Sequence, residues 1–472
     1  SMVFSSHIFL FYFLPLSLLL YYCMPKRGRN VLLTGVSYIF YGWSNPLFTL
    51  LMFYSTLIDY CCGLVIGLAR DDQQRRRKIG LLVSIAGNLS LLGFFKYTGF
   101  AMESYNQLFT LLGIDGFDPV PVLSFLLPLG ISFYTFQSMS YAIDVYRKDC
   151  DCIHNFLDFA CFVSMFPQLV AGPIIRFQEV ADQLASRVHS WEKFARGVAF
   201  FSLGMAKKVL LANSCGKIAD TAFAAGSLHW LDSWFGIVAY SFQIYFDFSG
   251  YSDMAIGLGL MFGFVFAKNF DSPYRSASIS EFWQRWHISL STWLREYLYI
   301  PLGGNRKGPT RTALNLAIVM LLGGLWHGAS WNFVAWGAIH GILLGSERLI
   351  GKKPFYFMLP RGLRICATFI LVLIAWVFFR AETFGGALTY LGSMFGLVDV
   401  PASSLLLDGL LYTPYSLLAM AMAALVVWWS PQTWDWSKEL GPMKVATVMT
   451  VFIFSVAVLS MQSYNPFIYF NF

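Results

Sequence analysis

Charged residues are scarce in this sequence. Of its 472 residues, 12% are charged and 57% are hydrophobic, whereas an ordinary soluble domain carries about twice that charged fraction. So few charges cannot cover a water-soluble surface. The segments 30–58 and 312–345 contain no Asp, Glu, Lys or Arg. Each is longer than the roughly 20 helical residues that cross ~30 Å of hydrocarbon. The sequence therefore predicts an integral membrane protein.

Motifs of several soluble enzymes are also absent. There is no G-x-S-x-G turn, no H-E-x-x-H helix, no phosphate-binding loop ending in G-K-S/T and no G-x-G-x-x-G, which excludes the classes that depend on them. The eight cysteines are scattered. Cys150 and Cys152 lie close together but lack a second pair at ligand spacing, so no metal site is predicted. The net charge of +7 is explained by membrane orientation, so no nucleic-acid partner is predicted.

Apolar runs recur along the whole chain, and they are continuous rather than alternating, which favours helices over a barrel. We expect an all-α polytopic fold of roughly 11 to 14 helices, including re-entrant and interfacial ones. The single membrane domain would cover residues 1–472. Besides the charge-free region 312–345, the runs lie at about 7–24, 31–43, 46–68, 79–98, 121–143, 155–175, 194–212, 231–263, 364–379, 411–429 and 444–461.

Basic residues orient these spans. The first run is followed by Lys26, Arg27 and Arg29 and has no small-residue cleavage site. It is therefore predicted to be a retained span with a periplasmic N-terminus, rather than a signal peptide. The remaining cytoplasmic loops are predicted at the basic clusters 70–78, 147–148 and 275–311.

The least hydrophobic interior segment, 268–311, is rich in arginine and aromatic residues. It predicts short interfacial helices partly embedded at the cytoplasmic face. A plain surface anchor is the alternative interpretation. Beyond it, glycines recur at four-residue spacing at Gly337, Gly341 and Gly345, and also at Gly324 and Gly328. Small residues at this spacing indicate close packing of membrane helices.

Three histidines lie in apolar surroundings: His287, His327 and His340. The small and polar residues at 328–332 predict a break between two helices, which would place His327 at the edge of an internal pocket. A neutral imidazole is a suitable base for transfer of an acyl group to a hydroxyl. A structural role is the alternative for His327, and packing is favoured for His340. His287 would bind a donor, orient His327 or cap a helix.

A second polar cluster interrupts the apolar run 231–263. Asp247 and Asp253 are its carboxylates, and buried carboxylates need partners. Structural ion pairs with arginines of the following loop are favoured over contact with a substrate. The residues predicted to be structural or to line a tunnel are Asp247, Ser249, Tyr251, Asp253 and Trp326.

Several ordered blocks carry a family resemblance. They begin with MVFSSHIFLFYFLPL and continue with LLPLGISFYTFQSMSYAIDVYR at 126–147, FPQLVAGPIIRF at 166–177 and YFDFSGYSDMAIGLGLMFGF at 245–264. The strongest are FWQRWHISLSTWLREYLYIPLGGNR at 282–306 and LLGGLWHGASWNFVAWGAIHG at 321–341. The chain resembles the membrane-bound O-acyltransferases, and most closely their bacterial alginate O-acetyltransferase branch. The resemblance covers about residues 2–395, and 396–472 match more loosely.

The resemblance implies a helical fold enclosing a tunnel in the bacterial inner membrane. His327 matches the histidine regarded as catalytic in the family, and His287 matches a second position that is Asn, Asp or His. The implied donor is acetyl-CoA from the cytosol. Periplasmic acetyltransferase subunits would then place the acetyl group on hydroxyls of an acidic polysaccharide such as alginate.

Cationic and polar residues of 268–311 are the predicted donor site, because charge-assisted hydrogen bonds suit phosphates. A role in membrane orientation alone is the alternative for them. His327 would act as a general base or as a nucleophile. Alternative functions are D-alanyl transfer to teichoic acids from a carrier-protein thioester, a transporter or channel, and a structural export subunit. The predicted donor-binding residues are Arg285, Arg295, Arg306, Lys307, Trp286 and Asn305.

Overall fold

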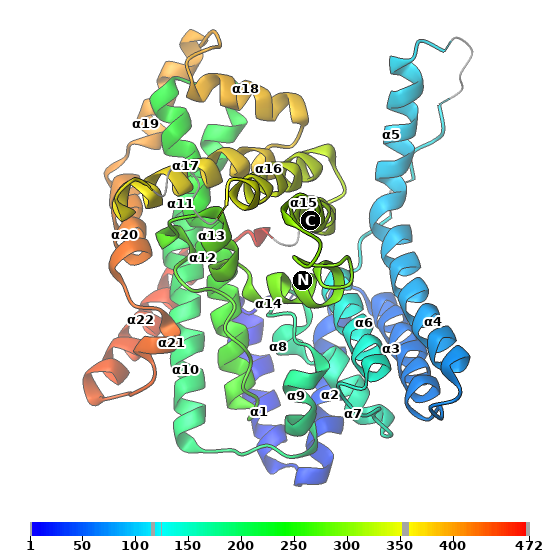
Figure 1. Cartoon of the computed structure of the whole chain (residues 1–472). Coiled ribbons are helices and arrows are strands. Elements are labelled where there is room, and N and C mark those ends of the chain that lie inside the picture. The colour runs from blue at the N-terminus through cyan, green and yellow to red at the C-terminus, as the bar shows by residue number, and fades with distance from the viewer. Residues whose placement is uncertain (1, 115–118, 124, 352–357, 469–472) are drawn as a thin grey trace. The chain divides into compact units, whose positions relative to one another are not determined.

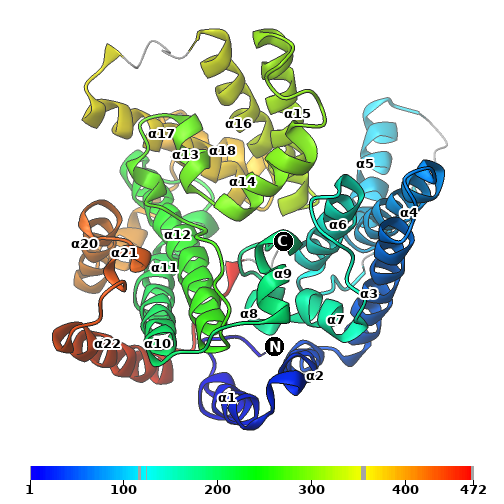
Figure 2. The same cartoon turned by 60° about the horizontal axis from the view of Figure 1, so that its bottom comes forward.

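The computed structural model describes residues 2–114, 119–123, 125–351 and 358–468. It divides into two compact units built from helices (Figures 1 and 2). The first comprises Ser1–His189, Phe262–Phe266 and Gly328–Ser330. The second comprises Ser190–Met261, Ala267–His327 and Trp331–Phe472. The predicted all-α fold class is confirmed, whereas the single-domain assignment stays a prediction.

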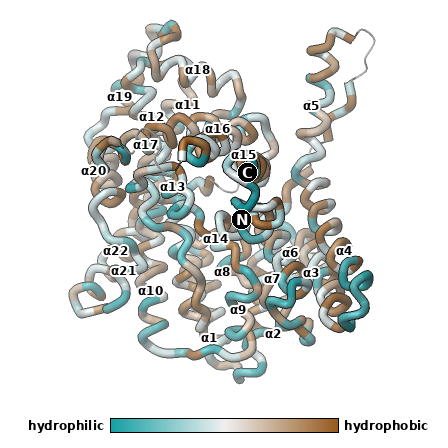
Figure 3. The backbone as a smooth tube through the Cα atoms, viewed as in Figure 1, coloured by the Kyte–Doolittle hydropathy of each residue, from teal (hydrophilic) through white to brown (hydrophobic). Residues whose placement is uncertain are grey.

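The first unit begins with apolar helices whose ends follow local rules. Asn45 caps α3 by accepting a hydrogen bond from the Leu47 backbone N–H, and Pro46 is its first residue, as is common at helix starts. The start of α4 is basic and appears teal in Figure 3. The helices are η1 (Phe9–Phe13), α1 (Leu14–Cys23), η2 (Lys26–Gly28), α2 (Arg29–Gly42), α3 (Pro46–Gly67), α4 (Gln74–Leu92), η3 (Gly93–Tyr97), α5 (Thr98–Leu111), α6 (Ile131–Arg147), α7 (Phe156–Ser164), α8 (Phe166–Leu169) and α9 (Phe177–Ala185).

The second unit is arranged around α12, whose side chains are buried along most of its length. Short helices follow α12, as predicted for 268–311. Its helices are α10 (Trp191–Ala206), η4 (Lys207–Ala212), α11 (Asn213–Ala224), α12 (Trp230–Met261), η5 (Pro273–Arg275), α13 (Ile279–Arg285), α14 (Ile288–Leu294), η6 (Arg295–Tyr299), α15 (Pro309–His327), α16 (Trp331–Leu349), α17 (Arg361–Arg380), α18 (Phe384–Met394), η8 (Ala402–Leu407), α19 (Asp408–Leu411), α20 (Pro414–Trp429), α21 (Thr433–Trp436) and α22 (Pro442–Met461).

Within the described residues, five helices are long and apolar enough to cross a membrane, and a bent pair formed by Ala402–Leu411 and Pro414–Trp429 would make six. The chain is therefore a multi-pass membrane protein. The five spans are Pro46–Gly67, Gln74–Leu111, Trp191–Ala224, Arg361–Arg380 and Pro442–Met461.

Two of the predicted runs are not one continuous helix. The run 155–175 divides into α7 and α8 because the backbone turns at Met165, before Pro167. In the run 121–143 the helix α6 begins only at Ile131, after Gly130 with φ 73°; residue 124 lies outside the described residues. Both departures follow proline or glycine, which interrupt a helix regardless of how apolar their neighbours are.

The predicted break after His327 is confirmed, since α15 ends at this histidine and α16 begins at Trp331. The two helices lie side by side (Figure 2). Their contact depends on glycine, because a Cβ added to Gly337 would lie 2.4 Å from the Met320 carbonyl oxygen. The predicted close packing is thus found at Gly337.

We predict that Gly337→Ala destabilises the protein, because the added methyl group must push α15 and α16 apart. The loss should be about 2 kcal/mol or more, as for overpacking elsewhere. Gly345→Ala is the matched control, since its Cβ would lie at an ordinary 3.4 Å from the Ala313 Cβ. Thermal unfolding in detergent measures both variants. Equal unfolding temperatures would contradict a backbone contact at Gly337.

Candidate active site

His327 is the last residue of α15 and is buried. Its Nδ1 lies 2.7 Å from the Gly323 carbonyl oxygen. A carbonyl can only accept a hydrogen bond, so Nδ1 carries the proton and Nε2 carries the lone pair. Aromatic rings surround the imidazole at centroid distances of 5.0 Å for Trp326, 5.0 Å for Trp336 and 5.5 Å for Phe379. The helix end therefore presents a basic nitrogen inside an aromatic enclosure.

His287 lies between α13 and α14 and is fully buried. Its φ of 46° is in the left-handed region, a conformation that a residue other than glycine keeps only when its surroundings enforce it. The His287 and His327 ring centroids are 6.3 Å apart, with the ring planes at 78°. The fold thus brings together the two histidines that the sequence singled out.

Asn269 determines which nitrogen of His287 is protonated. Its Oδ1 accepts a hydrogen bond from the Ser289 backbone N–H at 3.1 Å, and its Nδ2 donates to Ser252 at 2.9 Å. The backbone N–H can only donate, so the amide orientation is fixed. The same Oδ1 accepts a hydrogen bond from the Ser289 hydroxyl at 2.9 Å and lies 3.3 Å from His287 Nδ1. Because the hydroxyl proton is used on Oδ1, it is not available to Nδ1, which therefore donates to Oδ1 as well. In the neutral ring the lone pair is then on Nε2.

The neutral form of His287 is favoured by its surroundings. Burial lowers the pKa of His287 well below its usual value, and the neighbouring His327 lowers it further. Its Nε2 is buried and has no hydrogen-bond partner among the described residues. His287 therefore presents a buried nitrogen whose lone pair accepts no hydrogen bond from the described residues.

His340 differs from the other two histidines. Its Nδ1 accepts a hydrogen bond from Trp283 Nε1 at 3.1 Å, so this lone pair is already used. Its ring lies 4.9 Å from that of Trp336. To act as a base through Nδ1, His340 would have to break its hydrogen bond with Trp283. The arrangement therefore indicates a structural role.

Three buried polar atoms close to His327 lack partners among the described residues: His287 Nε2, His340 Nε2 and Trp336 Nε1. Buried polar atoms are normally paired, and exceptions call for an explanation. A site that receives the polar atoms of a substrate would explain these three atoms. Neither Asn269 nor Trp336 was singled out from the sequence, where an amide or an indole in an aromatic-rich segment gives no distinguishing signal.

The predicted acidic pair has partners, but the prediction of arginine partners is wrong. Asp247 forms an ion pair with Lys208 at 2.6 Å, and Asp253 forms one with Lys207 at 2.7 Å. Both lysines belong to η4, which packs against α12. Asp247 also accepts a hydrogen bond from the Ile468 backbone N–H at 2.8 Å. The lysines are adjacent in space although they lie far upstream in the sequence.

The other two residues predicted on α12 are also buried. Ser249 is 1% exposed, and the Tyr251 ring packs 4.6 Å from that of Phe467. Together with the ion pairs, these contacts describe a tightly packed helix.

Several predicted donor-binding residues have partners within the second unit. Arg285 forms an ion pair with Glu281 at 3.1 Å, and Arg295 forms one with Glu296 at 2.9 Å. Trp286 is buried among aromatic rings. The remaining three residues, Asn305, Arg306 and Lys307, are exposed next to one another. In the described part of the chain no group of three His, Cys, Asp or Glu residues is placed to hold a metal ion.

A membrane-embedded helical fold with two buried basic imidazoles suits acyl transfer, and comparison with known proteins agrees. The membrane-bound O-acyltransferase family model matches residues 150–383. The chain belongs to this family.

The probable alginate O-acetylase of Pseudomonas putida is 44% identical over 100% of both chains. The peptidoglycan O-acetyltransferase of Helicobacter pylori is 38% identical over 84% of this chain and 81% of its own. The teichoic acid D-alanyltransferase of Streptococcus thermophilus is 32% identical over 48% of this chain and 58% of its own. The predicted family and the predicted class of O-acetyltransferase are confirmed.

We predict that Asp247→Asn destabilises the protein, because it leaves the Lys208 ammonium buried without its counter-ion. Removing one partner of a buried ion pair costs about 3–5 kcal/mol. The double variant Lys208→Met/Asp247→Leu should recover the folded yield, since it removes both charges. Thermal unfolding and folded yield in detergent are the measurements. A stable but inactive Asp247→Asn protein would instead indicate contact with a substrate.

Proposed function

We propose that this chain moves an acetyl group from cytosolic acetyl-CoA towards the periplasm, for O-acetylation of an exported polysaccharide such as alginate. The observation that carries the proposal is the pair of buried histidines, whose Nδ1 atoms donate to Gly323 and Asn269, which places the lone pair of each neutral ring on Nε2. The names of the Pseudomonas putida and Helicobacter pylori relatives support acetyl transfer to a glycan.

His327 Nε2 is the proposed base. It removes the proton from the acceptor hydroxyl while the hydroxyl oxygen attacks the thioester carbon, the C–S bond breaks, and the proton passes to the departing thiolate. In the alternative route, Nε2 itself attacks the thioester carbon, the C–S bond breaks and the thiolate departs. The hydroxyl oxygen then takes the acetyl group from Nε2, and the hydroxyl proton passes to the thiolate. Trapping an acetylated protein in a single turnover distinguishes the second route from the first.

His287 is proposed to provide a second acceptor at the same site. Its ring lies within 6.3 Å of the His327 ring, measured between centroids. A hydroxyl or thiol that exchanges a proton with one imidazole is therefore next to the other. This role needs the tautomer that Asn269 enforces, with the lone pair on Nε2.

The donor phosphates are proposed to dock at the exposed turn that contains Asn305, Arg306 and Lys307. Arg306 directs Nη2 and Nε to the backbone carbonyls of Ile300 and Gly303, so its charge is not neutralised by a carboxylate. Arg285 and Arg295 are paired with glutamates and are proposed to support this turn electrostatically. Cations at such a position suit phosphates through charge-assisted hydrogen bonds.

The cellular setting is part of the proposal. We place the protein in the bacterial inner membrane as one membrane-bound O-acyltransferase domain with a periplasmic N-terminus, because the loops 26–29, 70–78, 147–148 and 275–311 concentrate positive charge, as cytoplasmic loops do. Periplasmic acetyltransferase subunits would accept the acetyl group and deliver it to the acidic polysaccharide.

We predict that His327→Ala reduces acetyl-CoA turnover by about 10²–10⁴-fold, the range for loss of a positioned general base. Purified protein in nanodiscs, with oligomannuronate and the periplasmic subunits supplied, provides the assay. His229→Ala is the control, since His229 is exposed and should leave turnover unchanged. Undiminished turnover by folded His327→Ala protein would refute the proposed base.

We predict that Asn269→Asp moves the acid limb of the kcat/KM profile to higher pH, by about one unit or more. A carboxylate beside Nδ1 stabilises the charged imidazole and raises the pKa of His287, so the Nε2 lone pair is lost at a higher pH than before. Asn269→Leu is the matched variant, which should lower kcat without this shift. If the pH dependence of kcat/KM were the same for both variants, Asn269 would have only a packing role.

D-alanyl transfer from a carrier-protein thioester is the second candidate, and the match to the Streptococcus thermophilus teichoic acid D-alanyltransferase favours it. Both reactions use a thioester and a hydroxyl, so the two histidines suit either. The two candidates differ in the donor. Consumption of free acetyl-CoA supports the first candidate, whereas turnover only with a loaded carrier protein supports the second.

A further inference from the structure

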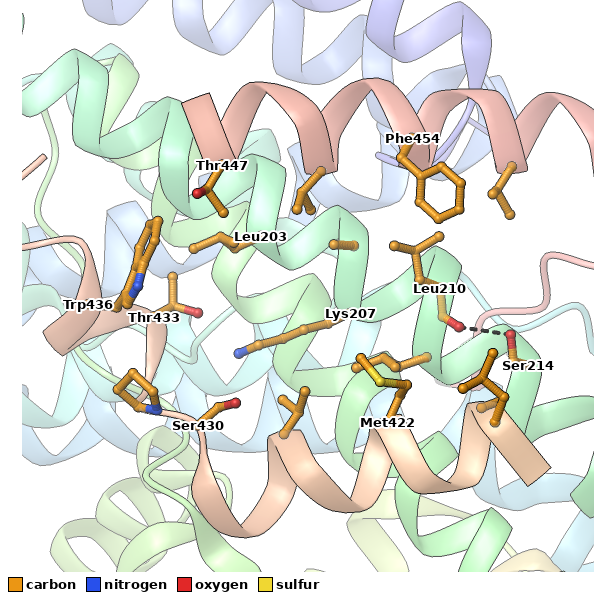
Figure 4. Close-up of a pocket in the computed structure, with 18 of the residues that line it drawn as sticks. Leu203, Lys207, Leu210, Ser214, Met422, Ser430, Thr433, Trp436, Thr447 and Phe454 are labelled. Atoms are coloured by element: carbon orange, nitrogen blue, oxygen red, sulfur yellow. Dashed lines mark hydrogen bonds between the residues drawn. The ribbon is translucent and has the colours of Figure 1, made fainter. Parts of the chain in front are cut away.

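A pocket of about 660 Å³ lies in the second unit, away from the histidines, between α10 with η4 on one side and α20 and α22 on the other (Figure 4). Its long apolar part is lined by residues such as Leu210, Met422 and Phe454. α22 is a candidate membrane span, and only 17% of its apolar window is buried. In a bilayer, this pocket therefore borders hydrocarbon.

One end of the pocket is polar. Lys207, Ser430, Thr433 and Trp436 gather there, and Figure 4 shows the Lys207 ammonium group pointing towards Ser430 and Thr433. Thr433 donates a hydrogen bond to Asp253 at 2.7 Å, and the Lys207 ammonium contacts the same carboxylate oxygen at 2.7 Å. The pocket thus has an apolar tail and a polar head.

Two cations outside the pocket lining contact α21 and the residue after it, next to the polar end. Arg196 donates to the Trp434 carbonyl at 3.0 Å and to the Ser437 hydroxyl at 3.2 Å. Lys444 donates to the Trp436 carbonyl at 2.7 Å. These hydrogen bonds all go to neutral oxygens. Tryptophan together with Lys and Arg at the end of a membrane span is typical of the headgroup level of a bilayer.

We propose that this pocket binds an anionic glycerophospholipid, with one acyl chain between α20 and α22 and the phosphate at Arg196 and Lys444. Charge complementarity favours this occupant. Lys444 is bonded to a neutral oxygen, and the Asp435 carboxylate near Arg196 is shared with Lys438, with which it forms an ion pair at 2.8 Å. Positive charge is therefore in excess around α21, which suits a phosphate. The apolar lining suits the acyl chain. An apolar helix of a partner protein would fill the pocket as well but would leave this excess positive charge uncompensated.

The polar end is also connected to the histidines through a series of contacts. Thr433 lines both this pocket and a small neighbouring one, which Asp253, Ser252 and Asn269 also line. Ser252 accepts a hydrogen bond from Asn269, and Asn269 holds His287. A lipid whose headgroup lies at this polar end is therefore next to the network that fixes the His287 tautomer, so its binding is expected to alter turnover.

The test is photo-crosslinking with a phosphatidylglycerol that carries a photoreactive group on one acyl chain, followed by mapping of the labelled peptides. Label is expected on α20 and α22. The double variant Arg196→Gln/Lys444→Gln should reduce labelling by about tenfold, because it removes the attraction of two cations for the lipid headgroup. Arg311→Gln, at an exposed position outside the pocket, is the charge control and should not reduce it.

A second pair of variants tests the apolar part. Ala419→Trp fills the pocket and should abolish labelling of α22, whereas Leu417→Trp, on the same helix outside the pocket lining, should not. Equal labelling by photoreactive phosphatidylcholine and phosphatidylglycerol, or labelling unaffected by both Arg196→Gln/Lys444→Gln and Ala419→Trp, overturns the proposal. So does a partner helix crosslinked in the pocket in its place.

The lipid site and the proposed acetyl transfer fail independently. His327→Ala should keep the label, because the lipid makes no contact with the histidine. Loss of turnover without loss of label would therefore concern catalysis alone. Conversely, an active protein that is not labelled refutes the lipid site and leaves the acetyl-transfer proposal intact.

Discussion

Every polar side chain placed inside this apolar chain must find its partner within the chain, because neither hydrocarbon nor an apolar core supplies one. The second unit satisfies this constraint with two ion pairs, Lys207 with Asp253 and Lys208 with Asp247, and with the amide of Asn269. Some buried side-chain atoms of the described residues lack a partner, and they occur in many parts of the fold. Those on His287 and Trp336 lie next to His327, where a substrate would supply the missing partners.

Much of the fold could be predicted from local sequence. The small and polar residues at 328–330 end α15, and the amphipathic character of 268–311 produces short helices. Other boundaries depend on single residues that a hydropathy profile averages away. Met165 turns the chain within a run that is apolar throughout, and the π-helix η4 places two successive lysines against α12. Those lysines could not be chosen as partners from sequence, because nothing local relates them to Asp247 and Asp253.

The candidate active site, like the fold, could be predicted from the sequence only in part. The two histidines were singled out because an ionisable group in an apolar setting is costly and so invites a functional explanation. Asn269 could not be predicted from the sequence. It fixes the tautomer of His287 through hydrogen bonds that exist only after folding, to Ser252, Ser289 and His287. The protonated nitrogen of each imidazole is a property of those bonds and not of the residue type. Sequence thus identified candidate bases, and geometry determined which atom of each one is basic.

The positions of the two imidazole protons also argue against the alternative function of a transporter. A proton relay through histidine needs one ring nitrogen to receive a proton while the other releases its own to a further acceptor. Here both Nδ1 protons are already held, by the Gly323 carbonyl and by the Asn269 amide oxygen, and both are bonded within the second unit. The two lone pairs sit within one aromatic enclosure rather than in a line of alternating donors and acceptors. Such an arrangement suits removal of a proton from a bound hydroxyl, which is what O-acyl transfer requires.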